Sequence, residues 1–427
     1  MDKPRSRPTL LVWLRPGVHI KRWLILAGGA LILSSLGIGL ILADLYRREP
    51  FPEFAYYLTL QFIPRLPRGI VILAAGIVLQ GLAWYRFSRS LLGAILPGTS
   101  GPVIRAAIER RYLQAGPRIV AIGGGTGLST LLQGLKEITS NSTAIVTVAD
   151  DGGSSGRLRR DLGILPPGDF RQCLVALADA EPLMARLLQH RFREAGDLGG
   201  HSFGNLFLTA LTEVTGSFER ALEECSRVLA VRGKVLPSTL ADVTLCAELA
   251  DGRIVRGESA IGHAGSPIRR VLLDPADAPA HPAAVQAILG ADVVIVGPGS
   301  LYTSVLPSLL VGDLAKAVRD TSARKVYVCN VATEPGETTG FGVDDFVRAL
   351  KEHLGDLGVD CVLANSNLRP AGRRLDLEAE PVELVRMDPD GWARGRLRVL
   401  GADVINEANP VRHDPRKLAT ALAQLVR

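Results

Sequence analysis

The sequence is poor in the residues that mark several common classes of protein. Its 427 residues include five cysteines, which are scattered and form no Cys-x-x-Cys pair. This usage predicts a reducing compartment and offers no spacing for a structural zinc site. Aromatic residues make up only 5% of the chain, and no basic patch with interleaved aromatics occurs. The composition therefore argues against nucleic acid as a partner.

The standard nucleotide-binding and hydrolase signatures are also missing. No Gly-Lys-Ser/Thr of a P-loop occurs, and a dinucleotide fingerprint started at Gly123 would need glycine where Leu128 stands. There is no nucleophile elbow with a Ser/His/Asp set, and no His/Cys spacing for a metal. Any chemistry is therefore expected to be of the phosphoryl type, carried by positioning of the ligand.

The N-terminal part predicts a membrane hairpin. Hydrophobic residues make up 47% of the chain, and residues 23–43, which carry no charge, are long enough to cross a bilayer. Residues 69–85 form a second, shorter apolar run. We predict transmembrane helices over these two runs within a hairpin at 23–89, after a basic N-terminus at 1–22 and before a linker with an amphipathic helix at 90–116.

The distribution of charge predicts the orientation of this hairpin. Most of the net charge of +6 lies in the first 22 residues, and arginines also follow the second apolar run. Both ends are therefore expected in the cytoplasm, which makes a multi-pass cell-membrane protein with its large C-terminal domain inside. The alternatives are a buried core helix and a cleaved signal peptide. Arg47 and Arg48, which follow the long first run, argue against the signal peptide.

Residues 117–427 alternate strand-like and helix-like segments, which predicts a Rossmann-like, doubly wound α/β fold with a mainly parallel sheet and helices on both faces. The first strand is the apolar run Ile119–Ile122, which ends in Gly123-Gly-Gly-Thr-Gly127. Leucines at helical spacing follow it. A strand, a glycine loop and a helix aim backbone N–H groups at one point, where a phosphate is favoured. An ordinary tight turn remains the alternative.

Three further polar loops follow directly on predicted strands, so four loops are expected to meet. They are Gly123–Ser129, Asp150–Arg157, Gly297–Ser304 and Asn330–Thr338. The carboxyl ends of parallel strands open onto one edge of the sheet, where ligands bind at the point of reversed strand order. These loops offer hydroxyl and N–H donors for phosphates, and Asp150 and Asp151 as acceptors for ribose hydroxyls or a metal ion.

Several side chains near these loops have two interpretations each. Asp169 is either a helix N-cap after a turn or an acid of the site. His201 is either a phosphate ligand or a plain loop histidine. Arg157 and Arg171 could bind a diphosphate or be solvated surface charges. Asp150 and Asp151 alternate along a strand, so one of them is expected to reach the ligand.

Five motifs in this order resemble the YvcK-like gluconeogenesis factors, which share a superfamily with CofD, the 2-phospho-L-lactate transferase. The motifs are Gly123–Ser129, Ala149–Arg157, Pro166–Arg171, His201–Asn205 and Gly297–Ser300. The resemblance implies a nucleotide-linked ligand: a UDP-sugar such as UDP-N-acetylglucosamine in the YvcK branch, or a phospholactate-bearing guanosine diphosphate, a deazaflavin and Mg²⁺ in the transferase branch. The loop at Glu334 departs from the family pattern, so that residue is not assigned.

The residues and the resemblance together predict the site. If the protein is an enzyme, Asp150 and Asp151 are catalytic, and Asp151 is a candidate Mg²⁺ ligand. The predicted ligand-binding residues are Gly123, Gly124, Gly125, Thr126, Gly127, Ser129, Gly153, Ser154, Ser155, Arg157, Asp169, Arg171, His201, Asn205, Gly297, Gly299, Ser300, Thr303 and Asn330.

Two functions are expected from these observations. The first is a non-catalytic, membrane-tethered regulator that binds a UDP-sugar and supports cell shape and envelope synthesis during gluconeogenic growth. It is expected to form a homo-oligomer and to have an envelope or regulatory protein partner. The second is an Mg²⁺-dependent transferase that moves a phosphorylated group from a nucleoside diphosphate carrier. A purely structural membrane adaptor is a third hypothesis.

Overall fold

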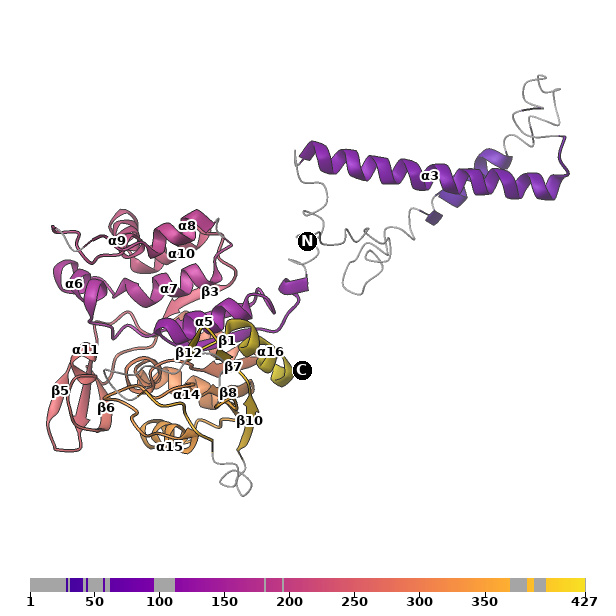
Figure 1. The fold of residues 1–427 in the computed structure, drawn as a ribbon. Coiled ribbons are helices and arrows are strands. Elements are labelled where there is room, and N and C mark those ends of the chain that lie inside the picture. Colours follow the sequence, from indigo (N-terminus) through magenta and orange to yellow (C-terminus); the bar gives the residue numbers. More distant parts are fainter. Residues whose placement is uncertain are drawn as a thin grey trace. The chain divides into compact units, whose positions relative to one another are not determined.

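The protein has two compact units. The computed structural model describes residues 28–29, 31–40, 44, 57, 62–95, 112–179, 182–193, 196–368, 382–387 and 397–426. The chain divides into Met1–Tyr112 and Leu113–Arg427, and Figure 1 shows the fold of each.

The first unit contains one long helix, α3 (Arg65–Ile95). It includes the second predicted span, 69–85, as continuous helix, and residues Leu66–Leu82 form its apolar part. Residues 28–29 and 31–40 of the first predicted span, 23–43, are helical, and Leu31–Leu40 is an apolar helix. The rest of that span and most of the amphipathic helix predicted in the linker lie outside the described residues. Among the described residues, no single helix combines the length and apolar character needed to cross a membrane, although the bent pair Leu301–Leu309 and Gly312–Asp320 meets the requirement by length and composition.

The second unit is built on a sheet of seven parallel strands. Their order is β10-β9-β8-β7-β1-β2-β3. Strands β1, β7 and β9 are buried along their whole length, as apolar strands covered on both faces must be. The strands are β1 (Ile119–Gly123), β2 (Ser142–Val146), β3 (Lys234–Pro237), β7 (Val293–Val296), β8 (Arg324–Val328), β9 (Cys361–Asn365) and β10 (Arg398–Ala402).

The order of the strands reverses between β1 and β7. From β1 the chain runs outward through β2 to β3, and after β7 it runs the other way through β8 to β9 and β10. Because crossovers between parallel strands are right-handed, the helices of the two halves cover opposite faces of the sheet. In Figure 1, α5 and α16 lie across the sheet from α15. The predicted doubly wound α/β fold is therefore confirmed, and its carboxyl edge has a crevice between β1 and β7.

The helices of this unit pack on the sheet through leucine-rich faces. For example, Leu128, Leu131, Leu132 and Leu135 of α5 are fully buried. The helices are α5 (Gly125–Leu135), α6 (Gly153–Leu162), α7 (Pro167–Leu177), α8 (Pro182–Gln189), α9 (Phe203–Thr215), α10 (Phe218–Val228), α11 (Glu258–Ile261), α12 (Pro282–Leu289), α13 (Leu306–Leu309), α14 (Gly312–Asp320), α15 (Val343–Leu354) and α16 (Pro415–Val426), with a π-helical turn at Leu301–Val305.

Two small antiparallel sheets complete the unit. The predicted hairpin around Asp251 and Gly252 is present, because β4 (Thr244–Leu249) pairs with β5 (Ile254–Arg256). On its other side β4 pairs with β6 (Ile268–Asp274). A second hairpin, β11 (Ile405–Asn406) with β12 (Asn409–His413), leads into the C-terminal helix.

One helix start differs from the prediction. Helix α7 begins at Pro167, so Asp169 lies inside its first turn and is not its N-cap. Proline is well suited to the first helical position because its missing N–H would have no partner there. The Asp169 carboxylate is thereby free to reach the glycine loop instead.

Candidate functional site

The glycine loop connects β1 to α5 at the reversal of strand order. Its glycines are required by close approach as well as by backbone conformation. A Cβ on Gly127 would lie 2.6 Å from the carbonyl oxygen of Pro298 in the loop after β7, and Gly125 has a φ of +61°. The loops that follow the two central strands are therefore packed directly against each other.

The start of α5 presents free backbone donors. The N-cap residue of this helix is Gly124, which has no side chain to accept these N–H groups. The Gly125 N–H donates to the Asp169 carboxylate at 2.7 Å, whereas the N–H groups of Thr126 and Gly127 have no partner in the described part of the chain. Two N–H groups at the positive end of a helix favour an anion.

A pocket of about 490 Å³ opens beside these donors. Three of the four predicted loops line it, namely those after β1, β7 and β8. Its lining residues are Gly124, Gly125, Thr126, Gly127, Thr130, Glu258, Pro298, Gly299, Ser300, Thr303, Ser304, Asn330, Val331, Ala332, Thr333, Glu334, Pro335, Glu337, Val382, Val411, Arg412 and His413. The volume is within the range of small-ligand pockets.

One wall of the pocket carries a hydrogen-bonded chain of hydroxyl and carboxyl groups. The Thr303 hydroxyl donates to the Ser300 hydroxyl at 2.7 Å, and Ser300 donates to the Glu337 carboxylate. Nearby, the Asn330 side-chain oxygen accepts the Gly299 N–H at 3.1 Å. The loops after β7 and β8 are thus tied together.

Three glutamates of the pocket, Glu258, Glu334 and Glu337, have raised pKa values. Burial is the main cause for each. It raises the pKa of Glu258 to about 8 and that of Glu334 to about 7, with the charge of Glu337 contributing to both. One buried oxygen of Glu334 has no hydrogen-bond partner among the described residues. Carboxyl groups in this state can both donate and accept hydrogen bonds, as recognition of sugar hydroxyls requires.

The pocket also has one cationic side chain, Arg412 on β12. It is the single Arg or Lys among the described lining residues, and its exposed side chain makes no hydrogen bond or ion pair within the described part of the chain. Next to it, the buried His413 ring contacts the Cys329 carbonyl at 3.2 Å, and burial lowers its pKa to about 4. His413 is therefore a neutral support, and Arg412 is the cation available to a ligand.

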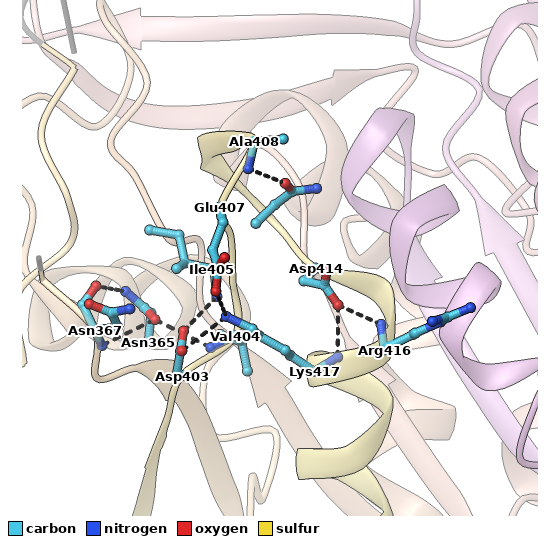
Figure 2. Close-up of polar contacts among 11 residues, drawn as sticks. Asn365, Asn367, Asp403, Val404, Ile405, Glu407, Ala408, Asp414, Arg416 and Lys417 are labelled. Carbon is cyan, nitrogen blue, oxygen red and sulfur yellow. Dashed lines mark hydrogen bonds and ion pairs between the residues drawn. The ribbon is translucent and has the colours of Figure 1, made fainter. Parts of the chain in front are cut away.

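A polar network fixes the hairpin that carries Arg412. Lys417 contacts Asp403 at 3.0 Å and Glu407 at 3.3 Å (Figure 2). The Asp414 carboxylate accepts the N–H groups of Arg416 and Lys417, both at 2.9 Å, at the start of α16. These contacts tie the hairpin of β11 and β12 to the start of α16.

The fourth predicted loop lies beside the pocket and does not line it. The Asp150 carboxylate accepts the Gly152 N–H at 2.9 Å, and its pKa is raised, mainly by burial. Burial and the charge of Asp150 raise the pKa of Asp169 to about 7. Asp151 instead accepts the Ser259 N–H at 2.8 Å at the start of α11. Asp150 is thus the one of the two aspartates that approaches Asp169 and the glycine loop.

The remaining predicted residues form a polar cluster where α6, α7 and α9 meet. The Ser154 hydroxyl lies 3.0 Å from Nδ1 of His201 and accepts from the Asn205 amide at 3.0 Å. Arg157 donates to the Gly199 carbonyl at 2.7 Å, and Arg171 is buried among these elements.

The structure thus divides the predicted residues into two groups. Those that line the pocket are Gly124, Gly125, Thr126, Gly127, Gly299, Ser300, Thr303 and Asn330. Those that do not line it are Gly123, Ser129, Asp150, Asp151, Gly153, Ser154, Ser155, Arg157, Asp169, Arg171, His201, Asn205 and Gly297. Sequence reasoning missed Thr130, Glu258, Glu337 and Arg412. Glu337 stands in a predicted loop, whereas no local signal marks Arg412.

The fold and the loops agree with one family of proteins. The model of the family 2-phospho-L-lactate transferase CofD matches residues 119–408. The chain belongs to the CofD/YvcK family. A gluconeogenesis factor of Bacillus subtilis is 49% identical over 312 residues, which are 73% of this chain and 98% of the relative. A relative from Nostoc sp., which is also named as a gluconeogenesis factor, is 46% identical over 415 residues. The match covers 96% of this chain and 91% of the relative.

A solved structure supports the same assignment. A UPF0052 family member from Bacillus halodurans is 46% identical to this CofD/YvcK protein, with a TM-score of 0.68. The match covers 72% of this chain and 99% of that one. The gluconeogenesis-factor resemblance of the five motifs is therefore confirmed at the level of the family.

Proposed function

We propose that this protein is a gluconeogenesis factor that binds a UDP-sugar in the pocket between β1, β7 and β8, and that it acts as a regulator of cell shape and envelope synthesis. The observation that carries the proposal is that one pocket contains two N–H groups, on Thr126 and Gly127, and the Arg412 guanidinium, none of which has a hydrogen-bond partner among the described residues. A diphosphate matches both because it is anionic and rich in acceptors.

The hydroxyl and carboxyl groups of the pocket support a sugar-bearing ligand. Ribose and hexose rings present hydroxyl groups, which need acceptors and donors together. Ser300, Thr303 and Glu337 supply such groups in one connected chain. Glu258 and Glu334 add carboxyls that burial keeps partly protonated near neutral pH. A ligand with a diphosphate and several hydroxyls therefore suits the pocket better than a simple phosphate.

Within the described residues no group of three or more His, Cys, Asp or Glu side chains could hold a metal ion, so the predicted Mg²⁺ would depend on the ligand's phosphates for most of its coordination. Mg²⁺ is usually held by one or two carboxylates together with ligand phosphates. Burial raises the pKa of both Asp150 and Asp169, and the charge of Asp150 raises that of Asp169 further, so a cation near them would relieve an unfavourable pair. Asp151 remains a predicted Mg²⁺ ligand, although its carboxylate is engaged by Ser259. When bound, the ion would supply charge neutralisation for the phosphates.

A transferase is the second candidate, because the family model carries the name of 2-phospho-L-lactate transferase. In that case Asp150 and Asp151 would face the acceptor. Incubation with a phospholactate-bearing guanosine diphosphate and a deazaflavin would release guanosine monophosphate from an enzyme and none from a binding protein.

Calorimetry tests the first proposal. UDP-N-acetylglucosamine is titrated into the full chain and into Arg412→Ala, with Arg416→Ala on α16 as the matched control. Loss of a charge-assisted contact of about 1.5–3 kcal/mol should weaken binding by roughly 10- to 100-fold in Arg412→Ala and leave the control unchanged. Absence of wild-type binding at millimolar ligand would overturn the proposal.

We further propose that the N-terminal unit tethers the protein to the cell membrane, with the large unit in the cytoplasm. The uncharged run at 23–43 and the exposed apolar side chains of α3, such as Leu66, Leu73 and Leu79, support this. Homo-oligomerisation and an envelope or regulatory protein partner remain predictions. Fractionation of cells into membrane and soluble pools tests the tether, since a soluble full-length protein contradicts it.

A further inference from the structure

The polar cluster outside the pocket contains a buried arginine without a partner. Arg171 is 7% exposed, and it forms no hydrogen bond and no ion pair within the described part of the chain. Its Nε is completely enclosed. The two terminal nitrogens of Arg171 are not enclosed in the same way, so they can donate to a ligand that enters from solvent. A largely desolvated guanidinium without a counter-charge favours an anionic ligand.

The surroundings of Arg171 contain a matching unsatisfied acceptor. A Cβ on Gly204 would lie 2.7 Å from Cδ of Arg171, so the side chain crosses the first turn of α9 next to Asn205. Asn205 is 2% exposed and donates to Ser154 at 3.0 Å, but its side-chain oxygen has no partner in the part of the chain that the structure describes. A buried donor and a buried acceptor thus stand unsatisfied at the same helix start.

The charges nearby favour an anion over a bridging water. Burial and the positive charge of Arg191 lower the pKa of Arg171. Burial and the positive charge of Arg157 lower the pKa of His201. Asp169 lies close enough to attract Arg171 but forms no ion pair with it, and its carboxylate is bound to the Gly125 N–H. A water molecule could hydrogen-bond to Nε of Arg171 and to the Asn205 oxygen, but it would not neutralise the positive charge of the arginines.

We propose that Arg171 and Asn205, with Arg191, Ser154 and His201, form a binding site for a small phosphorylated molecule, separate from the nucleotide-sugar pocket. The phosphate oxygens accept from the guanidinium, and a hydroxyl group of the phosphate or of its carrier donates to the Asn205 oxygen. None of these five residues lines the pocket. The site would let a second metabolite bind the same domain, and it does not depend on the identity of the first ligand.

The test uses inorganic phosphate as the probe and the full chain as the protein. Phosphate at about 100 times its dissociation constant should raise the melting temperature of the wild type by about 5 °C. Arg171→Met should abolish this rise. It should also raise the melting temperature in phosphate-free buffer, because it removes a buried unpaired charge while keeping the aliphatic packing against Gly204.

Asn205→Asp is the second variant, because it keeps the size of the side chain and places a carboxylate beside Arg171. It should likewise stabilise the phosphate-free protein and remove the response to phosphate. Arg412→Ala is the control in the pocket and should retain the response. The proposal is overturned if phosphate has no effect on the wild type, if the response is lost in Arg412→Ala and kept in Arg171→Met, or if Arg171→Met and Asn205→Asp both lower the melting temperature.

Discussion

At the scale of single residues, the pocket is marked by carboxyl groups that burial pushes toward the protonated form. Glu258, Glu334 and Glu337 face one cavity, whose single described cation is Arg412. Such groups are unfavourable for folding when ionised. Their presence at the lining of a cavity is typical of a functional site rather than of a stabilising network.

The raised pKa of Glu258 predicts a specific pH dependence of stability. Its folded pKa of about 8 lies above its ordinary value of 4.5, so the folded state binds the proton more tightly. The stabilising contribution is complete below about pH 4.5 and is lost as pH rises toward 8, with a slope of up to about 1.4 kcal/mol per pH unit. Denaturant unfolding of Glu258→Gln should show a flatter decline over this window. The exposed Glu223→Gln should behave as the wild type, and equal slopes in all three proteins would contradict the prediction.

Gly127 tests the close packing of the two central loops. In Gly127→Ala the new Cβ meets the Pro298 carbonyl at 2.6 Å, so the loops must separate. We expect a loss of about 1–3 kcal/mol of unfolding free energy and a pocket with disturbed N–H donors. Gly312→Ala is the control, because nothing lies within 4 Å of its Cβ, and it should change stability by less than about 0.5 kcal/mol. Equal effects of the two substitutions would refute the role of loop contact.

Some of the residues predicted for the site, such as Gly124 to Gly127, line the pocket and have a local signal in the sequence, and their binding of a ligand stays a prediction. Gly124 to Gly127 stand out because a run of glycines directly after an apolar strand is typical of a loop that closely approaches a ligand or another backbone. Arg412 could not be found, because it reaches the pocket through the pairing of β12 with β11, far along the chain. For Asp169 the sequence left two interpretations open, a helix N-cap and an acid of the site. The structure excludes the cap, because Asp169 accepts the Gly125 N–H, a contact that the packing of α5 against α7 creates.

At the scale of elements, the central strands were predictable and the supports of the site were not. The predicted strand Ile119–Ile122 is β1 (Ile119–Gly123). Strands β7 and β8 end at Val296 and Val328, close to the predicted loops that begin at Gly297 and Asn330. The hairpin of β11 and β12 has only two and five residues, and its position depends on side-chain contacts such as Asn365 with Val404 at 3.4 Å. Periodicity carries no information on such contacts.

The start of α16 gives a prediction at this scale. Asp414 caps the helix through two N–H groups at 2.9 Å. Asp414→Ala should cost about 0.5–2 kcal/mol of unfolding free energy and should also weaken UDP-sugar binding, because Arg412 lies two residues before the cap. Asp414→Asn keeps a capping oxygen, so it should retain most of the unfolding free energy and most of the affinity for the UDP-sugar. Unchanged affinity in a destabilised Asp414→Ala protein would show that the cap does not position Arg412.

At the scale of the whole molecule, the two compact units predict separable roles. The boundary falls between Tyr112 and Leu113, and the Bacillus subtilis relative matches 73% of this chain with 98% of its own length. The sequence alone predicts that the large domain starts at residue 117. At that point long apolar runs and a linker give way to alternating strand-like and helix-like segments, and this change is visible in the residue pattern.

A truncated chain of residues 113–427 should therefore fold and bind ligand as the full chain does. Its melting temperature should lie within a few degrees of the full chain, and its dissociation constant for UDP-N-acetylglucosamine within about twofold, because every lining residue of the pocket belongs to this unit. Circular dichroism and calorimetry provide the comparison. A truncated chain that folds but binds at least tenfold more weakly would assign part of the ligand site to the N-terminal unit.

The most direct measurement is a crystal structure of the protein with UDP-N-acetylglucosamine. We predict the diphosphate within hydrogen-bonding distance of the Thr126 and Gly127 N–H groups and in contact with Arg412, with ligand hydroxyls on the chain of Ser300 and Glu337. A diphosphate bound elsewhere, such as at Arg171, with the pocket after β1 left empty, would contradict the assignment of this pocket to the nucleotide-sugar.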